Sequence, residues 1–356
     1  MKINYESTKN LIENIFHSYG FTEDESKSIT ASLLAADLAG IESHGIQRLV
    51  RYDDAIRRKM VDVEAKPEII HETSLSAVID AHKAMGQLVS EQAMNLAIDK
   101  ATAHGIGMVA VRNSNHFGMA GYYARMASQK NLIGMAMTNS EAIMVPTNAR
   151  KAMLGSNPIA LAFPASPVDF CFDAATTVVP RGKLEVYNKA EKATPDGWMV
   201  NATGAPSNNP GEVIANISAR AGGGILPLGG VSEATGSHKG YGFGMMCELF
   251  TSVLSGGPMS YQSYQVDGVA DTAHFFMAIN CDLFGSPEEI KNTCSALLED
   301  LRNTPKAEGK DRIYIHGEKE IEFAVNVKKD GIPVNEKTIK ELKTIASSQG
   351  LVCNLD

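Results

Sequence analysis

Residues 104–128 read HGIGMVAVRNSNHFGMAGYYARMAS. The apolar run at 107–111 predicts a buried strand, and residues 119–128 predict a helix. Between them, residues 113–118 form a row of polar or conformationally special residues at the carboxyl end of the strand, where α/β enzymes place ligand contacts. This stretch therefore predicts an α/β fold with a candidate site at a strand-to-helix turn.

The same stretch contains a formal GxGxxA match at Gly105, Gly107 and Ala110. In the Rossmann fold this motif follows a strand and opens a helix, whereas here it ends a helix and enters a strand. We therefore expect no pyrophosphate site at these glycines. Walker A, HExxH and GxSxG motifs are absent from the sequence.

The rest of the chain divides into three regions. Residues 1–75 are predicted to form a helical lobe, with Gly20 ending one helix and a capping box of Thr22 and Glu25 opening the next. Residues 76–310 alternate strands and helices, including long loops over 193–238 and a buried helix at 240–254. Residues 311–356 are expected to add a strand at 320–327 and a closing helix at 337–348, and to pack back on the first lobe. The predicted fold class is α/β with a helical N-terminal lobe.

Composition narrows the class of protein. The 356 residues carry a formal net charge of -8, which disfavours nucleic acid as a partner because phosphate binding needs a concentrated basic surface. The N-terminus has no apolar signal region, and no apolar stretch reaches the ~18 residues of a membrane-spanning helix. The five cysteines are far apart and form no CxxC pair, which favours the reducing cytoplasm over disulfides or structural zinc.

Two histidines are candidates for proton transfer. His44 lies in Glu42-Ser43-His44-Gly45 between two predicted helices, and Arg48 four residues later could pair bidentately with a carboxylate. His116 lies in the polar turn described above. The structural alternatives are a helix cap with a surface arginine at the first motif and a capped turn with a structural histidine at the second. No ligand spacing on a shared element supports a metal site at these histidines.

Several loops are weaker candidates for ligand contacts. Ser140 ends a predicted strand, residues 172–177 leave another strand through small residues, and Lys183 in a basic turn could meet a phosphate. His238 and Lys239 stand at a predicted helix start, a plausible anion site. Taken singly, each of these segments is more often an ordinary loop.

Together these segments resemble the malate/L-lactate dehydrogenase family of NAD(P)-dependent oxidoreductases, which also includes sulfolactate, ureidoglycolate and diketogulonate enzymes and an imine reductase. The resemblance spans residues 42–318 and rests on the stretches ESHGIQRLVRY, RNSNHFGMAGYYA, MTNSEAIMVP, LGSNPIALAFP, FDAATTVVPRGK, PDGWMVNATG, ILPLGG, HKGYGFG and IHGEKE. It implies a nicotinamide-binding mixed sheet unlike the Rossmann unit, which accounts for the missing fingerprint, and a homodimer.

The resemblance also implies roles for individual residues. His44 and His116, with the neighbouring Ser43, match the acid/base group, and Arg48 matches the arginine that holds the substrate carboxylate; His116 would also contact the substrate. Positions expected to bind the cofactor are Ser140, Phe172, Asp173, Ala174, Ala175, Thr176, Lys183, His238, Lys239, His316, Gly317 and Glu318.

This sequence also departs from the family pattern. Asn201 stands where many relatives have Asp, and residues 231–237 resemble an insertion. Lys183 occupies the neighbourhood in which imine-reducing relatives carry an acidic residue, which disfavours that activity.

The expected reaction is hydride transfer between NAD, or NADP, and a small 2-hydroxyacid or 2-oxoacid. Malate and oxaloacetate are the first expectation, with lactate, sulfolactate or ureidoglycolate as alternatives. The ordinary acidic ribose contact has no identifiable counterpart, so the sequence does not choose between the two cofactors. Alternatives from other classes are a metal-dependent hydrolase or lyase built on His44 and His116, and a catalytically silent nucleotide-binding protein.

Overall fold

A mixed sheet of seven strands forms the centre of the molecule. The computed structural model describes residues 1–263 and 272–355. Within these residues the strand order is β2-β3-β4-β11-β5-β6-β7, and β3 and β4 are the only neighbouring strands that pair in parallel. The strands span Glu68–Glu72 (β2), Ser76–Asp80 (β3), Ile106–Ser114 (β4), Leu132–Thr138 (β5), Ile159–Phe163 (β6), Phe170–Ala174 (β7) and Thr272–Asn280 (β11).

Strand β11 joins two parts of the sheet that are distant in sequence. It lies antiparallel to both β4 and β5, with His274 opposite Val111 on one side and Thr138 on the other. Consequently β4 and β5 point the same way, and their carboxyl ends meet at one edge of the sheet together with the start of β11. This edge carries the polar turns singled out in the sequence.

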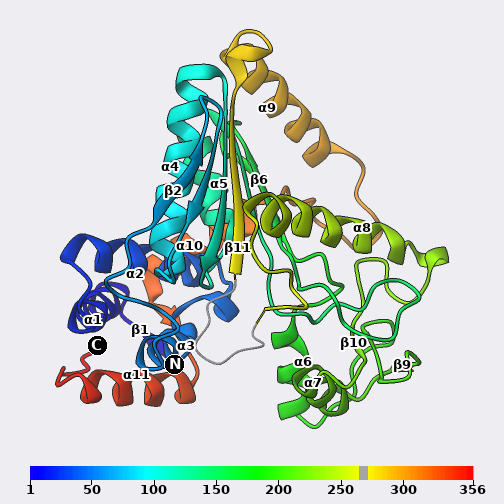
Figure 1. Cartoon of the computed structure of the whole chain (residues 1–356). Helices are drawn as coiled ribbons and strands as arrows, with labels where there is room; N and C mark the ends of the chain where they lie inside the picture. Colours follow the sequence, from blue (N-terminus) through cyan, green and yellow to red (C-terminus); the bar gives the residue numbers. More distant parts are fainter. Residues whose placement is uncertain (264–271, 356) are drawn as a thin grey trace.

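Each face of the sheet is covered by helices (Figure 1). On one face, α4 (Gly86–His104) and α5 (Ala120–Ser128) bury a large core of mostly small and β-branched side chains, which lets helix and sheet approach closely. On the other face lies α8 (Ser237–Glu248), which continues as a π-helical turn over Leu249–Val253. There Cys247 and Phe250 pack against Met137 and Phe275 of the sheet.

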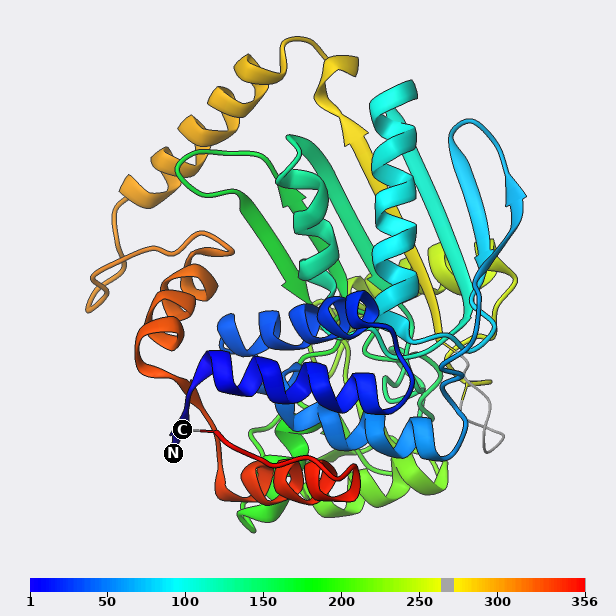
Figure 2. The same ribbon diagram turned by 90° about the vertical axis from the view of Figure 1, so that its left-hand side faces the viewer.

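A helical lobe lies beside the sheet (Figure 2). Its helices are α1 (Tyr5–Ser18), α2 (Glu23–Leu38), α3 (Leu49–Arg57), α10 (Glu318–Asp330) and α11 (Glu336–Ser348). The capping box of Thr22 and Glu25 is confirmed at the start of α2. The C-terminal segment packs on the N-terminal one: β12 (Ile332–Pro333) pairs with β1 (Lys2–Ile3), and Leu342 and Ile345 of α11 share a buried cluster with Ile12 and Ile15 of α1.

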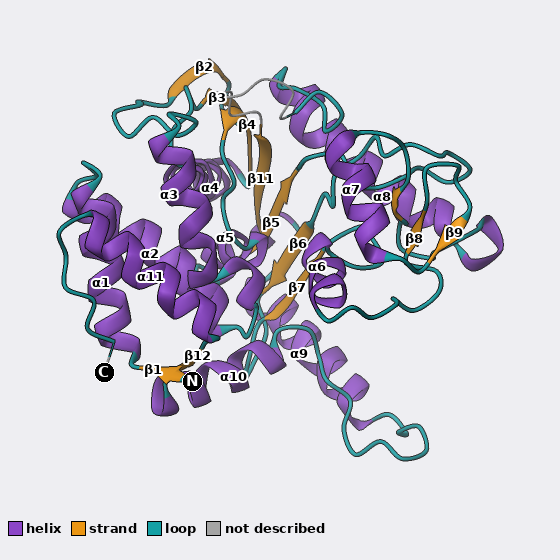
Figure 3. Ribbon diagram, turned by 90° about the horizontal axis from the view of Figure 1, so that it is seen from below, coloured by secondary structure: helices purple, strands orange, loops and turns teal. Residues whose placement is uncertain are grey.

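A third region lies across the sheet from this lobe (Figure 3). It contains α6 (Arg181–Lys189), α7 (Pro210–Ala219) and a small sheet of β10 (Gly224–Ile225), β8 (Met199–Val200) and β9 (Pro206–Ser207). Helix α9 (Pro287–Asn303) projects from the far end of β11. None of the described helices is both long and apolar enough to cross a membrane.

Three sequence predictions of local structure were wrong: two concern the type of element, and the third concerns the burial of a helix. The predicted strand at 320–327 is part of helix α10; the alternating Ile321, Phe323, Val325 and Val327 suggested a strand, but the acidic first turn and basic last turn suit a helix dipole. The segment 193–238 is not all loop, because Asn209 caps α7 through the Glu212 amide.

The helix predicted to be buried is buried on one side only. In the single chain, Phe243, Met246, Leu249 and Val253 are each exposed by 42–49%. The helix is apolar around most of its circumference, and the sheet covers only one side of it.

Candidate active site

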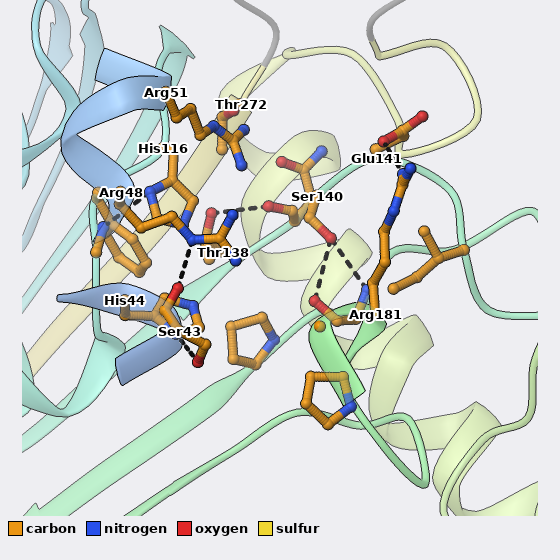
Figure 4. Close-up of a pocket in the computed structure, with 18 of the residues that line it drawn as sticks. Ser43, His44, Arg48, Arg51, His116, Thr138, Ser140, Glu141, Arg181 and Thr272 are labelled. Atoms are coloured by element: carbon orange, nitrogen blue, oxygen red, sulfur yellow. Dashed lines mark hydrogen bonds and ion pairs between the residues drawn. The ribbon is translucent and has the colours of Figure 1, made fainter. Parts of the chain in front are cut away.

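A cavity of about 410 Å³ lies at the edge where β4 and β5 end and β11 begins. Its size is in the range of small-molecule sites. The helical lobe contributes Ser43, His44, Arg48 and Arg51, the sheet edge contributes His116, Thr138, Ser140 and Thr272, and the third region contributes Pro180, Arg181 and Glu185. Figure 4 shows these side chains converging from the three regions.

The turn carrying His44 is held tightly against α2. The Asp37 carboxylate is 5% exposed and accepts the Ile46 amide at 2.8 Å. A Cβ atom at residue 45 would overlap the same carboxylate, so this position needs glycine because of the close approach. Burial raises the pKa of Asp37 to about 7, against the lowering effect of the Ile46 hydrogen bond.

The turn carrying His116 is fixed by its neighbours on both sides. The Asn115 side-chain amide donates to the carbonyls of Met60, Lys83 and Ala84 at 3.1–3.2 Å. Phe117 stacks on His274 with ring centroids 4.6 Å apart. These contacts tie the turn to the helical lobe and to β11, so the backbone that carries His116 is rigid.

The two candidate histidines stack in the cavity. Their ring centroids are 5.5 Å apart with an interplanar angle of 20°. Nδ1 of His116 lies 2.8 Å from the Tyr52 hydroxyl, and Nδ1 of His44 lies 3.0 Å from the Ser43 hydroxyl. Each ring is therefore held through Nδ1, which leaves Nε2 for a ligand.

Both imidazoles are neutral at pH 7. Burial, with the charges of Arg48 and Arg51, lowers the pKa of His44 to about 4. Burial also lowers the pKa of His116 well below its ordinary value, and the charge of Arg51 adds to this more than that of His44 or Arg48. Unprotonated rings of this kind can accept a proton from a substrate hydroxyl.

Three arginines line the cavity. Arg48 donates through Nε to the Ser43 carbonyl, and this bond orients its guanidinium. Arg51 follows on the same helical face. Arg181 forms ion pairs with Glu141 at 3.2 Å and Glu185 at 3.3 Å. The site is therefore suited to an anionic ligand.

Ser140 belongs to a network of hydroxyl groups on the cavity wall. Its Oγ accepts the Ser156 amide at 3.0 Å and lies 3.3 Å from the Ser156 hydroxyl. The buried Thr176 hydroxyl donates to the Ser156 carbonyl at 3.0 Å, so the strand end at 174–176 adjoins the same wall.

Further along β7 lie other residues that the family resemblance assigned to the cofactor. Phe172 and His316 pack edge to face with centroids 5.4 Å apart. The Asp173 carboxylate accepts the Gly121 amide at 2.7 Å, and burial raises its pKa to about 6. These contacts place Asp173 beside the start of α5 and His316 beside Phe172 of β7.

Among the twelve predicted cofactor residues, Ser140 lines this cavity, and the other eleven lie outside its lining. Lys183, His238 and Lys239 are exposed at the starts of α6 and α8. The Glu318 carboxylate is engaged by Arg302, Arg312 and the Ile315 amide. Glu318 thus ties the chain before α10 to α9.

Sequence reasoning missed Asp37, Arg51, Tyr52, Arg181 and Thr272. Arg51 could have been found, because three residues after Arg48 is the same face of a helix. Thr272 and Arg181 come from distant segments, and no local pattern marks them. Among residues 1–263 and 272–355, no three or more His, Cys, Asp or Glu side chains are grouped to hold a metal ion.

The site combines neutral histidines with arginines at the edge of a mixed sheet without a Rossmann unit. This combination defines a class of enzyme that exchanges a proton with an anionic substrate. Comparison with known proteins places the chain within that class. The family model described as malate/L-lactate dehydrogenase matches residues 3–343. This chain belongs to the malate/L-lactate dehydrogenase family, as its sequence motifs predicted, and is an oxidoreductase of the hydroxyacid type.

Individual relatives agree over nearly the full length. The malate dehydrogenase of Pyrococcus abyssi is 42% identical over 341 residues, which are 96% of this chain and 92% of that protein. The L-sulfolactate dehydrogenase of Methanocaldococcus jannaschii is 36% identical over 355 residues, which are 97% and 96% of the two chains. The crystal structure of malate dehydrogenase from Entamoeba histolytica has a TM-score of 0.95 and 35% identity and covers 99% of both chains. The predicted fold class is thus confirmed.

Proposed function

We propose that this protein interconverts malate and oxaloacetate with a nicotinamide cofactor. The observation that carries the proposal is that two neutral histidines, Arg48 and Arg51 line one and the same cavity. The malate dehydrogenases at 41–42% identity support malate as the first substrate. Sulfolactate, lactate and ureidoglycolate are the alternatives within the same reaction type.

His116 is the proposed acid/base residue. For Nε2 to act as the base, the neutral ring must carry its proton on Nδ1 and donate it to the hydroxyl oxygen of Tyr52, and the protonated ring keeps the same hydrogen bond. In the oxidation, Nε2 takes the proton of the substrate hydroxyl; in the reduction, the protonated ring returns it to the new hydroxyl oxygen. His44, supported by Ser43, would hydrogen bond to the same substrate oxygen.

Arg48 is proposed to hold the C1 carboxylate. Its Nε is engaged by the Ser43 carbonyl, which leaves the terminal nitrogens for a paired contact with two carboxylate oxygens. Arg48→Lys keeps the charge but loses this geometry, so its Michaelis constant for the oxoacid should rise about tenfold or more. An unchanged Michaelis constant would refute the role.

The residues present fit a nicotinamide cofactor. The hydroxyls of Ser140 and Ser156 are suited to its carboxamide, and the Phe172–His316 aromatic pair is suited to a flat base. Ser140, Phe172, Asp173, Ala174, Ala175, Thr176, His316, Gly317 and Glu318 are proposed to hold it, and Lys183, His238 and Lys239 to meet its phosphates. When bound, the cofactor exchanges hydride with C2 of the substrate. NAD is the first expectation, and NADP is the alternative.

The test is oxidation of NADH and NADPH at 340 nm with oxaloacetate, pyruvate, sulfopyruvate and a cyclic imine. We expect the fastest turnover with oxaloacetate, and this result would identify the cofactor and the substrate together. His116→Asn should lower kcat by at least ~100-fold, more than His44→Asn does. If no oxoacid is turned over although cofactor binds, the proposed substrate is wrong.

We also propose that the chain works as a homodimer in the cytoplasm. The exposed apolar side chains of α8 and its π-helical continuation form a face of the kind that marks protein interfaces, and a second copy would cover it. The cytoplasmic location is proposed because the five cysteines are far apart in the sequence and form no CxxC pair.

A further inference from the structure

A buried histidine lies behind the wall of the cavity. His274 on β11 is 0% exposed and is not among the residues that line the cavity. Its Nδ1 lies 2.8 Å from the Thr138 hydroxyl at the end of β5, and its Nε2 lies 2.8 Å from the Ser114 hydroxyl at the end of β4. One side chain therefore connects three strands at the edge where the cavity lies. The proton transfer proposed above does not involve this ring.

The face of the His274 ring supports the turn that carries His116. Phe117 stacks on it with an interplanar angle of 3° and ring centroids 4.6 Å apart. Phe117 lines the cavity and directly follows His116 in the chain. Phe276 packs against the same imidazole at a centroid distance of 6.1 Å, so the ring lies among packed aromatic side chains. Since such packing leaves little free space, a movement of the His274 ring would displace Phe117 and with it the proposed base.

The two hydroxyl groups fix the orientation of the ring. Ser114 is fully buried and Thr138 is 6% exposed, so water cannot easily replace either partner. The Thr138 hydroxyl also lies 2.9 Å from the Asn139 carbonyl, and Thr138 lines the cavity together with His116 (Figure 4). Because both ring nitrogens are engaged, the imidazole cannot rotate or shift between the strands without breaking a buried hydrogen bond.

His274 is neutral and is suited to a fixed connection between strands. Burial lowers its pKa to about 3, against the raising effect of a hydrogen bond with the Asn115 backbone. A neutral imidazole has one N–H donor and one acceptor nitrogen, and a hydroxyl group can serve either of them. Both hydrogen bonds are therefore satisfied without a charge, and the ring does not need to exchange a proton with the cavity.

We propose that His274 is a positioning residue for the acid/base histidine His116. Hydrogen bonds to Ser114 and Thr138 hold its ring in place. The ring in turn holds Phe117, which fixes the neighbouring His116. A displacement of about 1 Å in a reacting group lowers the rate by a large factor, so this support acts on the chemical step and not on binding. The inference rests on the proposed dehydrogenase function and adds a residue that acts from outside the cavity.

The main test is His274→Phe, which keeps a ring of similar size for Phe117 to stack on and removes both nitrogens. With oxaloacetate and NADH, kcat should fall about tenfold to a hundredfold, while the Michaelis constants change by less than about threefold. In a His116→Asn background, the same substitution should lower kcat by less than about threefold, because the group that it positions is gone. An equal loss in both backgrounds, or no loss beside an intact His116, would overturn the proposal.

Two buried hydroxyl groups provide a matched pair of milder variants. Ser114→Ala removes the partner of Nε2 and leaves the His274 ring and the cavity lining in place, so kcat should fall about threefold to tenfold. Ser128→Ala removes a buried hydroxyl of α5 that donates to the Arg125 carbonyl, and should keep its kcat. This pair tests the role even if His274→Phe does not fold. Equal kcat values in the two variants would contradict it.

A measurement on His116 itself separates this inference from the proposed function. NMR of the ring nitrogens in protein labelled at histidine needs no turnover, and in the wild type His116 should be unprotonated at neutral pH with its hydrogen on Nδ1. In His274→Phe and Ser114→Ala the turn should loosen and admit water, so the pKa of His116 should rise toward its ordinary value. Absence of turnover with this difference intact would overturn the dehydrogenase proposal alone, whereas identical His116 signals in all three proteins would overturn the role of His274.

Discussion

The surroundings of His44 and His116 favour the unprotonated form of both imidazoles. Burial penalises the imidazolium form, and Arg48 and Arg51 add repulsion, so the pKa of His44 falls to about 4 and that of His116 falls well below its ordinary value. An anionic substrate bound beside them would bring opposite charge and raise both pKa values in the complex. Substrate binding and proton uptake are thus coupled at these two rings.

This coupling predicts the pH dependence of malate oxidation. The reaction needs an unprotonated base, and a lowered pKa extends the unprotonated range toward acid. The value of kcat/KM for malate should therefore stay constant from pH 8 through pH 6.5, because burial holds the pKa of the proposed base His116 well below its ordinary value. Initial rates in a constant-ionic-strength buffer series check this, and a half-maximum near pH 6.5 would contradict it.

Tyr52 offers a test of the support behind His116. The ring of Tyr52 is 2% exposed, so Tyr52→Phe keeps the packing and removes only the hydroxyl that contacts Nδ1. We expect kcat to fall about tenfold and the free energy of unfolding by about 1 kcal/mol. Tyr19→Phe, which loses a hydroxyl contact with Asp53 in the same lobe, is the control and should keep its kcat. Equal rates in both variants would remove Tyr52 from the mechanism.

The turn between α2 and α3 positions three cavity side chains through one buried contact. Asp37 on α2 accepts the Ile46 amide, and Gly45 lets the backbone pass directly over the carboxylate. Ser43, His44 and Arg48 all lie within three residues of this crossing. The geometry of the turn therefore depends on the absence of a side chain at one position.

Gly45→Ala should damage the site more than the fold. The added methyl group overlaps the Asp37 carboxylate, so the turn must shift, at a cost of about 1–3 kcal/mol in the free energy of unfolding. A shift of this kind in catalytic side chains should lower kcat/KM by about 100-fold. Thermal unfolding and kinetics measure the two effects. Val50→Ala, an exposed neighbour, is the control, and an active Gly45→Ala would show that the turn tolerates movement.

At the scale of the whole molecule, the cavity exists because three regions meet at one edge of the sheet. The helical lobe brings arginines and His44, the sheet brings His116 and Thr138, and the third region brings Arg181. The same architecture leaves α8 with one side on the sheet and one apolar side uncovered.

The uncovered side of α8 predicts the state of association. Light scattering after size exclusion should give the mass of two 38.2 kDa chains for the wild type. Phe243→Asp combined with Leu249→Asp places charges on the exposed face and should produce monomers, because a buried unpaired charge is costly at an interface. Val352→Asp in the exposed C-terminal tail should remain dimeric. A double variant that stays dimeric would place the interface elsewhere.

Features encoded within a few residues were predictable from the sequence. The capping box of Thr22 and Glu25 depends on contacts between near neighbours, and it was confirmed. The linear motifs spread over residues 42–318 were together sufficient to identify the family. Where local signals conflicted, as in α10, the alternating apolar pattern was misleading because a helix can also bury Val327 while exposing Val325.

By itself, then, the sequence determined the type of most elements and the family, and it singled out the two histidines and Arg48 as candidate site residues, because caps, periodicity and motifs are local or linear properties. Only the tertiary structure decided that β11 lies between β4 and β5, that the Tyr52 hydroxyl contacts His116, and that Arg181, Arg48 and Arg51 line one cavity. These features join segments many residues apart. They depend on which surfaces pack against each other in the folded chain, and no local pattern in the sequence predicts that packing.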